Sequence, residues 1–184
     1  MLQFRLWRRW RYAFDRVIAN SQAMRDELVA AGIGPVEVVP NGVPVTREPA
    51  PLGPVPTVVF AGRLVPEKGA DVLVRAFPDV ISAVPEARLG IAGDGPDRNR
   101  IRAALPAGWE GNQVRLLGRV SRASLDGQFE GAWVQAVPSV WVEPFGISAA
   151  EALMRGTPVV ASDRGGLPEI VIDGLTGIVC DDLD

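Results

Sequence analysis

The stretch that decides the fold is PSVWVEPFGISAAEALMRGTPVVASDRGGLPEIVIDGLTGIV, residues 138–179. It carries an apolar strand at Pro158–Ala161 and leads into a second one at Gly177–Cys180. A helix-like segment begins near Gly146, before the first strand, and a short one near Leu167 separates the two strands. Near-continuous apolar strands that alternate with helices are typical of a parallel sheet covered on both faces.

The same alternation extends upstream to residue 57. Four further apolar strands are expected, at Thr57–Ala61, Arg88–Ala92, Val114–Leu117 and Val134–Pro138. Helix-like segments begin near Ala70, Asp97 and Ser121. Pro78 lies inside the first of these, and its ring is expected to kink or split that helix. The sequence therefore predicts an α/β fold, a Rossmann-like parallel sheet of about six strands with helices on both faces.

A second, smaller unit precedes this sheet. An amphipathic helix over residues 2–18 is expected, with an apolar stripe surrounded by five arginines. A short apolar stretch at Val17–Ala19, a helix that Ser21 caps and that ends near Ala31, and a strand at Val36–Val39 follow. Five prolines between residues 44 and 56 predict a stiff linker. We therefore divide the chain into residues 1–43, a linker at 44–56, and a domain at 57–184.

Composition excludes several classes of site. The 184 residues include one cysteine and no histidine, so neither an internal disulfide nor a histidine base or zinc ligand is available. The formal net charge of −3 gives no basic field for nucleic acid. Apolar runs are shorter than the ~20 residues that a membrane span needs, and the N-terminus lacks the features of a signal peptide. We expect a cytoplasmic protein, with peripheral membrane contact or self-association through the N-terminal helix as alternatives.

Charged residues follow the first strand of the predicted sheet. The loop GRLVPEKG, residues 62–69, begins at Gly62 and carries Arg63 and Lys68. Because ligands of doubly wound sheets bind beyond the carboxyl ends of the strands, these two cations can clamp a diphosphate. The alternative is that both are ordinary solvated surface charges.

Two glutamates flank the start of the helix near Gly146. The amides of Phe145, Gly146 and Ile147 are expected to point outward at this helix start, which favours anion binding. Glu143 precedes the helix and can reach sugar hydroxyls, whereas Glu151 lies within it and can accept hydrogen bonds from a ribose. The alternatives are a helix-dipole contact for Glu143 and an exposed helix position for Glu151.

Two glycine-bearing loops give weaker signals. Gly93 and Gly95 follow the second strand, where small residues allow a ligand to approach closely, although a plain turn capped by Asp94 or Asp97 explains them equally. The loop SDRGGLPE, residues 162–169, permits positive φ, and taken alone it is interpreted as an ordinary loop.

Together these segments resemble the C-terminal domain of family 4 glycosyltransferases, which have the GT-B fold. The matching pieces are GRLVPEKG, GDGP, residues 138–179 and, earlier, VIANSQAMRDEL and VVPNGV. The resemblance implies that Arg63 and Lys68 bind the donor diphosphate and that Glu143 and Glu151 form the family's EX7E pair. It also implies that the backbone of Val120 meets the nucleotide base, and that no metal or other cofactor is required.

The resemblance implies a retaining glycosyltransferase that moves a sugar from a UDP-, GDP- or ADP-sugar to an unknown acceptor. It also implies that most of an N-terminal domain and some C-terminal helices lie outside this sequence, so we expect no detectable transfer by this chain alone. Two alternatives remain open. One is a nucleotide-sugar-binding module without turnover, and the other is a GT-B epimerase that uses the same donor pocket.

Overall fold

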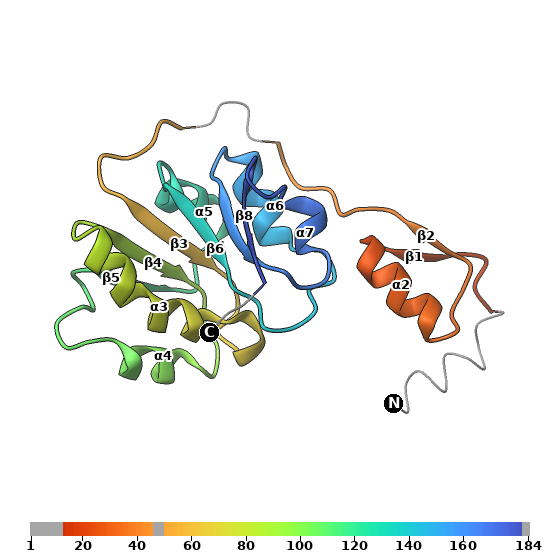
Figure 1. Cartoon of the computed structure of the whole chain (residues 1–184), viewed down its shortest axis with the longest axis horizontal. Coiled ribbons are helices and arrows are strands. Elements are labelled where there is room, and N and C mark those ends of the chain that lie inside the picture. Colours follow the sequence, from red (N-terminus) through yellow and green to blue (C-terminus); the bar gives the residue numbers. More distant parts are fainter. Residues whose placement is uncertain (1–12, 46–49, 182–184) are drawn as a thin grey trace.

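The protein consists of a small N-terminal lobe and a larger sheet domain (Figure 1). A computed structural model describes residues 13–45 and 50–181. The N-terminal lobe comprises β1 (Val17–Ala19), α2 (Gln22–Ala30) and β2 (Val36–Val38). Its two strands pair in parallel, with Val17 opposite Val36, so the lobe is a single βαβ unit.

The start of α2 agrees with the sequence prediction. The Ser21 hydroxyl accepts a hydrogen bond from the Met24 N–H, at 3.0 Å, as an N-cap does. The predicted helix over residues 2–18 falls mostly on residues 1–12, which lie outside the described part of the chain. Its predicted C-terminal end is wrong, because Val17 belongs to β1. Pairing with Val36, nineteen positions later, prevails there over the local helical pattern.

The sheet domain is built on a six-stranded, all-parallel sheet in the order β5-β4-β3-β6-β7-β8. Its strands are β3 (Thr57–Ala61), β4 (Arg88–Ala92), β5 (Val114–Gly118), β6 (Val134–Val137), β7 (Val159–Ser162) and β8 (Gly177–Cys180). The predicted α/β class, strand number and strand direction are confirmed, and the predicted strand ends differ by one residue at most.

Helices α3 (Ala70–Ala83), α4 (Arg98–Ala104), α5 (Arg122–Phe129), α6 (Ile147–Met154) and α7 (Leu167–Ile170) connect the strands, and a 3-10 turn, η2 (Pro66–Lys68), precedes α3. The sequence predicts that Pro78 kinks or splits the first helix; a split is wrong, since α3 continues through Pro78 as one element. Val74 and Phe77 are almost fully buried on the inner face of α3. Their packing holds the helix in place although one backbone hydrogen bond is missing.

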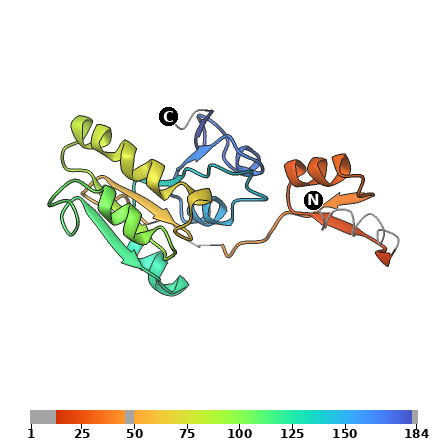
Figure 2. The same ribbon diagram turned by 90° about the horizontal axis from the view of Figure 1, so that it is seen from below.

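Side-chain alternation along β3 shows that both faces of the sheet are covered (Figure 2). Phe60 belongs to the core beneath α3 and α4, together with Phe77 and Ile101. Its neighbour Val59 packs instead in a cluster with Phe129 of α5. Successive strand residues point to opposite faces, so α5 lies on the face opposite α3 and α4.

The chain order places a crevice between β3 and β6. After β3 the chain moves outward to β4 and β5, and after β6 it moves the other way to β7 and β8. Right-handed crossovers in opposite directions put their helices on opposite faces, so the connections leave a gap beyond the carboxyl ends of β3 and β6. This topological switch point is where ligands of open α/β sheets bind.

Candidate functional site

A cavity of about 450 Å³ lies at this switch point. The N-terminal lobe contributes Asn20 and Asn41 to its wall. The sheet domain contributes seven of the residues that the sequence singled out: Gly62, Lys68, Glu143, Phe145, Gly146, Ile147 and Glu151. Residues that follow β3 and β6 therefore meet in one cavity with residues that follow β1 and β2 of the lobe. For β3 and β6 this is expected, because their carboxyl ends lie at one edge of the same sheet.

Lys68 and Glu143 form an ion pair across this cavity. The distance from Lys68 Nζ to Glu143 Oε1 is 2.5 Å, and the Ser139 hydroxyl donates to the same oxygen at 2.6 Å. Glu143 is only 5% exposed, so its carboxylate has lost nearly all contact with water. A buried carboxylate needs such partners, because an unpaired buried charge is strongly destabilising.

This ion pair corrects one sequence-based expectation. The alternative that Lys68 and Arg63 are both ordinary solvated surface charges does not hold for Lys68, whose side chain is only 29% exposed. Its ammonium group also lies 5.4 Å from the centre of the Trp141 ring, within range of a cation–π interaction. Arg63 is exposed, and within the described part of the chain it makes no side-chain hydrogen bond or ion pair. The two cations of the predicted clamp are therefore held differently.

The start of α6 forms another wall of the cavity. Gly146 adopts φ 101°, a left-handed conformation that favours glycine, and α6 begins at the next residue. Among the described residues no side chain caps this end, and the first N–H groups of α6 have no acceptor within the helix. Phe145 is buried, whereas Ile147 is about half exposed. This helix start offers partial positive charge to a ligand in the cavity.

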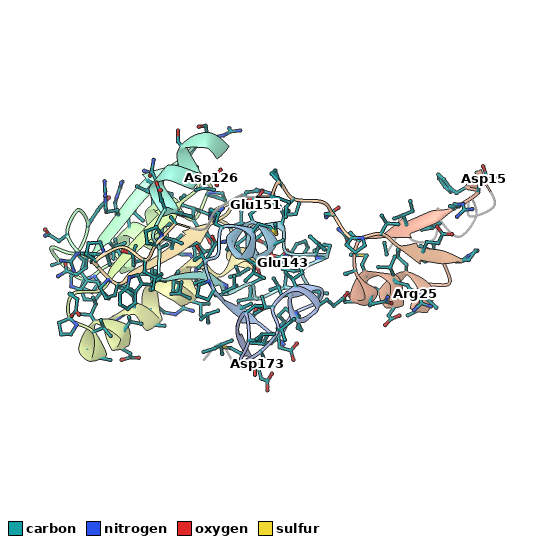
Figure 3. The ribbon with its side chains drawn as sticks, turned by 90° about the horizontal axis from the view of Figure 1, so that it is seen from above. Asp15, Arg25, Asp126, Glu143, Glu151 and Asp173 are labelled. Atoms are coloured by element: carbon teal, nitrogen blue, oxygen red, sulfur yellow. The ribbon has the colours of Figure 1, made fainter. Side chains whose placement is uncertain are left out.

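Glu151 lies within α6 and is half-buried rather than exposed. Figure 3 labels it together with Glu143, close to α6 in the middle of the molecule. Both carboxylates line the 450 Å³ cavity, so the eight-residue spacing in the sequence places them around one space.

A second cavity, of about 480 Å³, shares Ala61 and Gly62 with the first. It contains three other predicted residues, Arg63, Gly93 and Val120. Gly95 lines neither cavity. A Cβ at Gly95 would lie 2.3 Å from the Leu64 carbonyl oxygen, so close packing between two loops explains this glycine.

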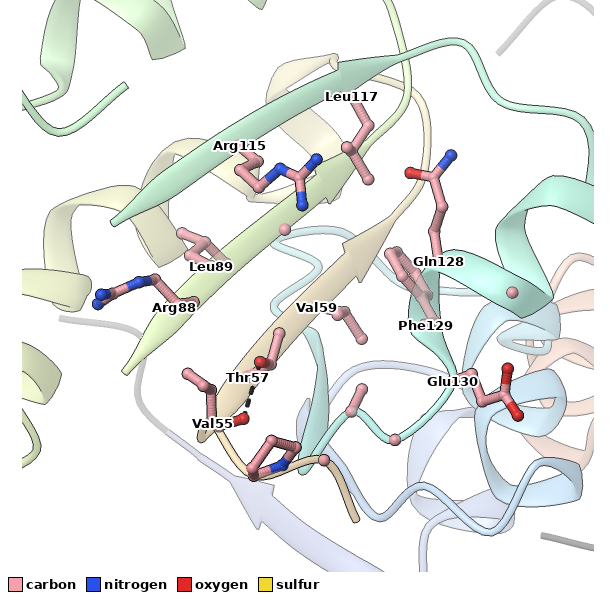
Figure 4. A pocket seen from close by; sticks show the side chains of 16 residues that line it. Val55, Thr57, Val59, Arg88, Leu89, Arg115, Leu117, Gln128, Phe129 and Glu130 are labelled. Carbon is pink, nitrogen blue, oxygen red and sulfur yellow. Dashed lines mark hydrogen bonds between the residues drawn. The ribbon is translucent and has the colours of Figure 1, made fainter. Parts of the chain in front are cut away.

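A third and larger cavity, of about 770 Å³, lies away from these strand ends (Figure 4). It lies between strands β3, β4 and β5 and the end of α5, and Arg88, Arg115 and Phe129 are among its lining residues. None of the residues singled out from the sequence lines it. It is therefore a separate feature of the sheet face.

The structure also reveals residues that the sequence analysis missed. Ser139 and Trp141 contact the Lys68–Glu143 pair, and Asp94 and Arg119 line the second cavity. Asn20 and Asn41 follow β1 and β2, at the carboxyl ends of parallel strands. That position is a recognisable signal for a ligand-facing side chain, and for Asn41 it was available from the predicted strand at Val36–Val39.

Two searches of the described residues gave negative results. Across residues 13–45 and 50–181, no group of three or more His, Cys, Asp or Glu side chains is arranged to hold a metal ion. Within the same ranges, no helix has the length and apolar character needed to cross a membrane.

Comparison with known proteins supports the functional interpretation. The family described as "Glycosyl transferases group 1" matches residues 46–184, and "Glycosyltransferase Family 4" matches residues 1–47. Glycogen synthase from Mycobacterium tuberculosis is 34% identical over 180 residues, which cover 90% of this chain and 42% of that protein. The GDP-mannose-dependent alpha-(1-6)-phosphatidylinositol monomannoside mannosyltransferase of Mycolicibacterium smegmatis is 40% identical over 145 residues, or 75% of this chain and 38% of that protein.

Solved structures show the same architecture. Anabaena HepE in complex with UDP and glucose is 27% identical, with a TM-score of 0.75 over 92% of this chain and 50% of that one. S. aureus TarM in a complex that contains UDP has a TM-score of 0.84 at 22% identity, over 94% of this chain and 35% of that one. The chain thus spans half or less of these similar proteins. The matches, the GT-B-type sheet and the residues gathered at its switch point lead to one conclusion: the chain belongs to the group 1 glycosyltransferases.

Proposed function

We propose that this protein takes part in the transfer of a sugar from a nucleoside diphosphate sugar to an acceptor, with retention of anomeric configuration and without a metal ion. The observation that carries the proposal is the meeting of Lys68, Glu143 and the start of α6 in one cavity at the switch point. Membership of the glycosyltransferase family and the UDP bound to the similar HepE structure support it.

The proposed diphosphate site has three sources of positive charge. Arg63 is exposed beside Gly62, which both cavities share, and Lys68 and the α6 N-terminus line the 450 Å³ cavity. When the bond to the sugar breaks, negative charge builds up on the leaving diphosphate. Fixed positive groups at that position stabilise the transition state more than the ground state.

Lys68 has a second role in this proposal. In the structure its ammonium group neutralises Glu143. A bound diphosphate competes for the same ammonium group, and Glu143 then requires other donors, which sugar hydroxyls can provide. We therefore assign Glu143 to the donor sugar, Glu151 to the ribose, and the backbone near Val120 to the base.

A ligand screen tests the proposal directly. The thermal unfolding of the chain is measured with UDP-, GDP- and ADP-sugars, since a ligand at 100 times its Kd adds about 2.7 kcal/mol of stability. Stabilisation by one nucleotide series and not by the others identifies the base. If none of the three series stabilises the chain, the donor-site assignment is wrong.

Product analysis separates the proposed transferase from its two alternatives. Transfer or hydrolysis of the bound donor with retained configuration supports a retaining transferase. Binding without any change in the donor indicates a binding module, and recovery of a nucleotide sugar inverted at C2 indicates an epimerase. We place this chemistry in the cytoplasm, with contact to a membrane surface through the arginine-rich N-terminal segment as an alternative.

A further inference from the structure

The start of α2 is held by a carboxylate from the other part of the molecule. The Gln22 N–H donates to Glu169 Oε2 and the Ala23 N–H donates to Glu169 Oε1, each at 2.8 Å. The next N–H, of Met24, is bound by the Ser21 hydroxyl. Glu169 belongs to α7 of the sheet domain, whereas α2 belongs to the N-terminal lobe. Two of the first three amides of α2 therefore bind across the boundary between the two parts.

This contact is well suited to fix an orientation. The N-terminus of a helix carries partial positive charge, and hydrogen bonds from N–H groups to a carboxylate are stronger than those between neutral groups. Each oxygen of Glu169 is engaged by a separate amide, so the contact restrains direction as well as distance. Ser21 caps α2 from within the lobe, so the helix retains a local cap of its own without Glu169.

The segment around Glu169 also touches the candidate site. The Gly166 N–H donates to the Glu143 carbonyl oxygen at 2.7 Å. A Cβ at Gly166 would lie 3.0 Å from the Cβ of Ser21, so the N-terminal lobe packs directly on this segment. Asn20, the residue before Ser21, lines the same cavity as Glu143. The segment is thus in contact with both walls of the cavity.

We propose that Glu169 is a positioning residue that fixes the N-terminal lobe on the sheet domain. Through this contact, Asn20 and Asn41 are held opposite Lys68 and Glu143. Without it, the two walls of the cavity keep their own structures but lose their mutual orientation. This contact acts on the assembly of the cavity, whichever nucleotide binds there.

Distance measurements between two spin labels test the proposal. In a Cys180→Ser background, labels are attached through Glu27→Cys on α2 and Glu86→Cys after α3, both at exposed positions. With Glu169 present we expect a narrow distribution of distances. Glu169→Ala should broaden it at least two-fold, and Glu169→Asp, which keeps the carboxylate, should restore part of the narrow distribution. Glu169→Gln should behave more like Glu169→Ala, because only one of its two terminal atoms is an acceptor and an NH2 donor then faces one of the two N–H groups.

Two controls distinguish positioning from general damage. Glu130→Ala removes the same charge from an exposed position of the sheet domain and should leave the distribution unchanged. Ser21→Ala removes the local cap but keeps Glu169, and should also leave it narrow. An unchanged distribution in Glu169→Ala overturns the proposal, and so does equal broadening by Ser21→Ala, which would indicate fraying of α2. Failure to bind any nucleotide sugar would refute the proposed function without altering this measurement.

Discussion

Replacing Lys68 should destabilise the fold even in the absence of any ligand. Glu143 is 5% exposed, and Lys68 is its cationic partner. Lys68→Met largely keeps the aliphatic stem of the side chain. Of the two donors to the Glu143 carboxylate, the Lys68 ammonium and the Ser139 hydroxyl, only the hydroxyl then remains. Removing one member of a fully buried pair costs about 3–5 kcal/mol. Lys68 is 29% exposed, so water can replace part of its contribution, and we expect a loss of about 2 kcal/mol.

Urea unfolding followed by circular dichroism measures this loss. Arg63→Ala is the matched control, since Arg63 lies on the same loop, is exposed and has no side-chain partner among the described residues. The unfolding free energy of Arg63→Ala should stay within about 0.5 kcal/mol of that of the parent chain. The double variant Lys68→Met, Glu143→Gln removes both charges. Its loss of unfolding free energy should be smaller than the summed losses of the two single variants by about 1 kcal/mol or more. Equal stability of Lys68→Met and Arg63→Ala, or additive single effects, would refute the reasoning.

Three further predictions concern binding. Arg63→Ala should weaken UDP or GDP binding by about 1.5–3 kcal/mol in calorimetry, the range for charged hydrogen bonds, and unchanged affinity would exclude Arg63 from the diphosphate site. Glu151→Ala should weaken a ribonucleotide while leaving pyrophosphate affinity nearly unchanged, because Glu151 is assigned to the ribose; equal losses would remove that assignment. If the N-terminal segment contacts membranes, the chain should float with anionic vesicles at low salt, and the double variant Trp7→Ala, Trp10→Ala should no longer float. If the chain does not float and becomes monomeric when residues 4–17 are deleted, the result favours packing of this segment against protein instead.

The sheet domain was predictable because its strands and helices have recognisable local sequence patterns. Strands such as Thr57–Ala61 are short and apolar, and Ser121 and Gly146 mark helix starts in the structure as in the sequence. Local signals were wrong where distant packing decides the outcome. Pro78 stays within α3 because the buried face of the helix holds it, and Val17 is in a strand because it pairs with Val36.

The candidate site was predictable in its membership and less so in its contacts. Residues that follow parallel strands meet at one edge, so the grouping of Lys68 with Glu143 and Gly146 follows from strand order. Their pairing does not, because residues 75 positions apart in the chain leave no spacing signal. The roles assigned to these residues in donor binding stay predictions until the variants above are measured.

The contacts of the loop of residues 162–169 follow the rule that backbone N–H and carbonyl groups need hydrogen-bond partners, although no sequence spacing indicates them. Taken alone, it is interpreted as an ordinary glycine-containing turn. In the structure, its Gly166 N–H binds the backbone of Glu143, and its Glu169 binds the first amides of α2. Both contacts satisfy groups that folding would otherwise leave without a partner, a backbone carbonyl and two N–H groups at a helix start. An acidic residue near a predicted strand end is therefore worth testing against every helix start that lacks enough local acceptors. In this chain that search includes α2, where Ser21 accounts for only one of the first three amides.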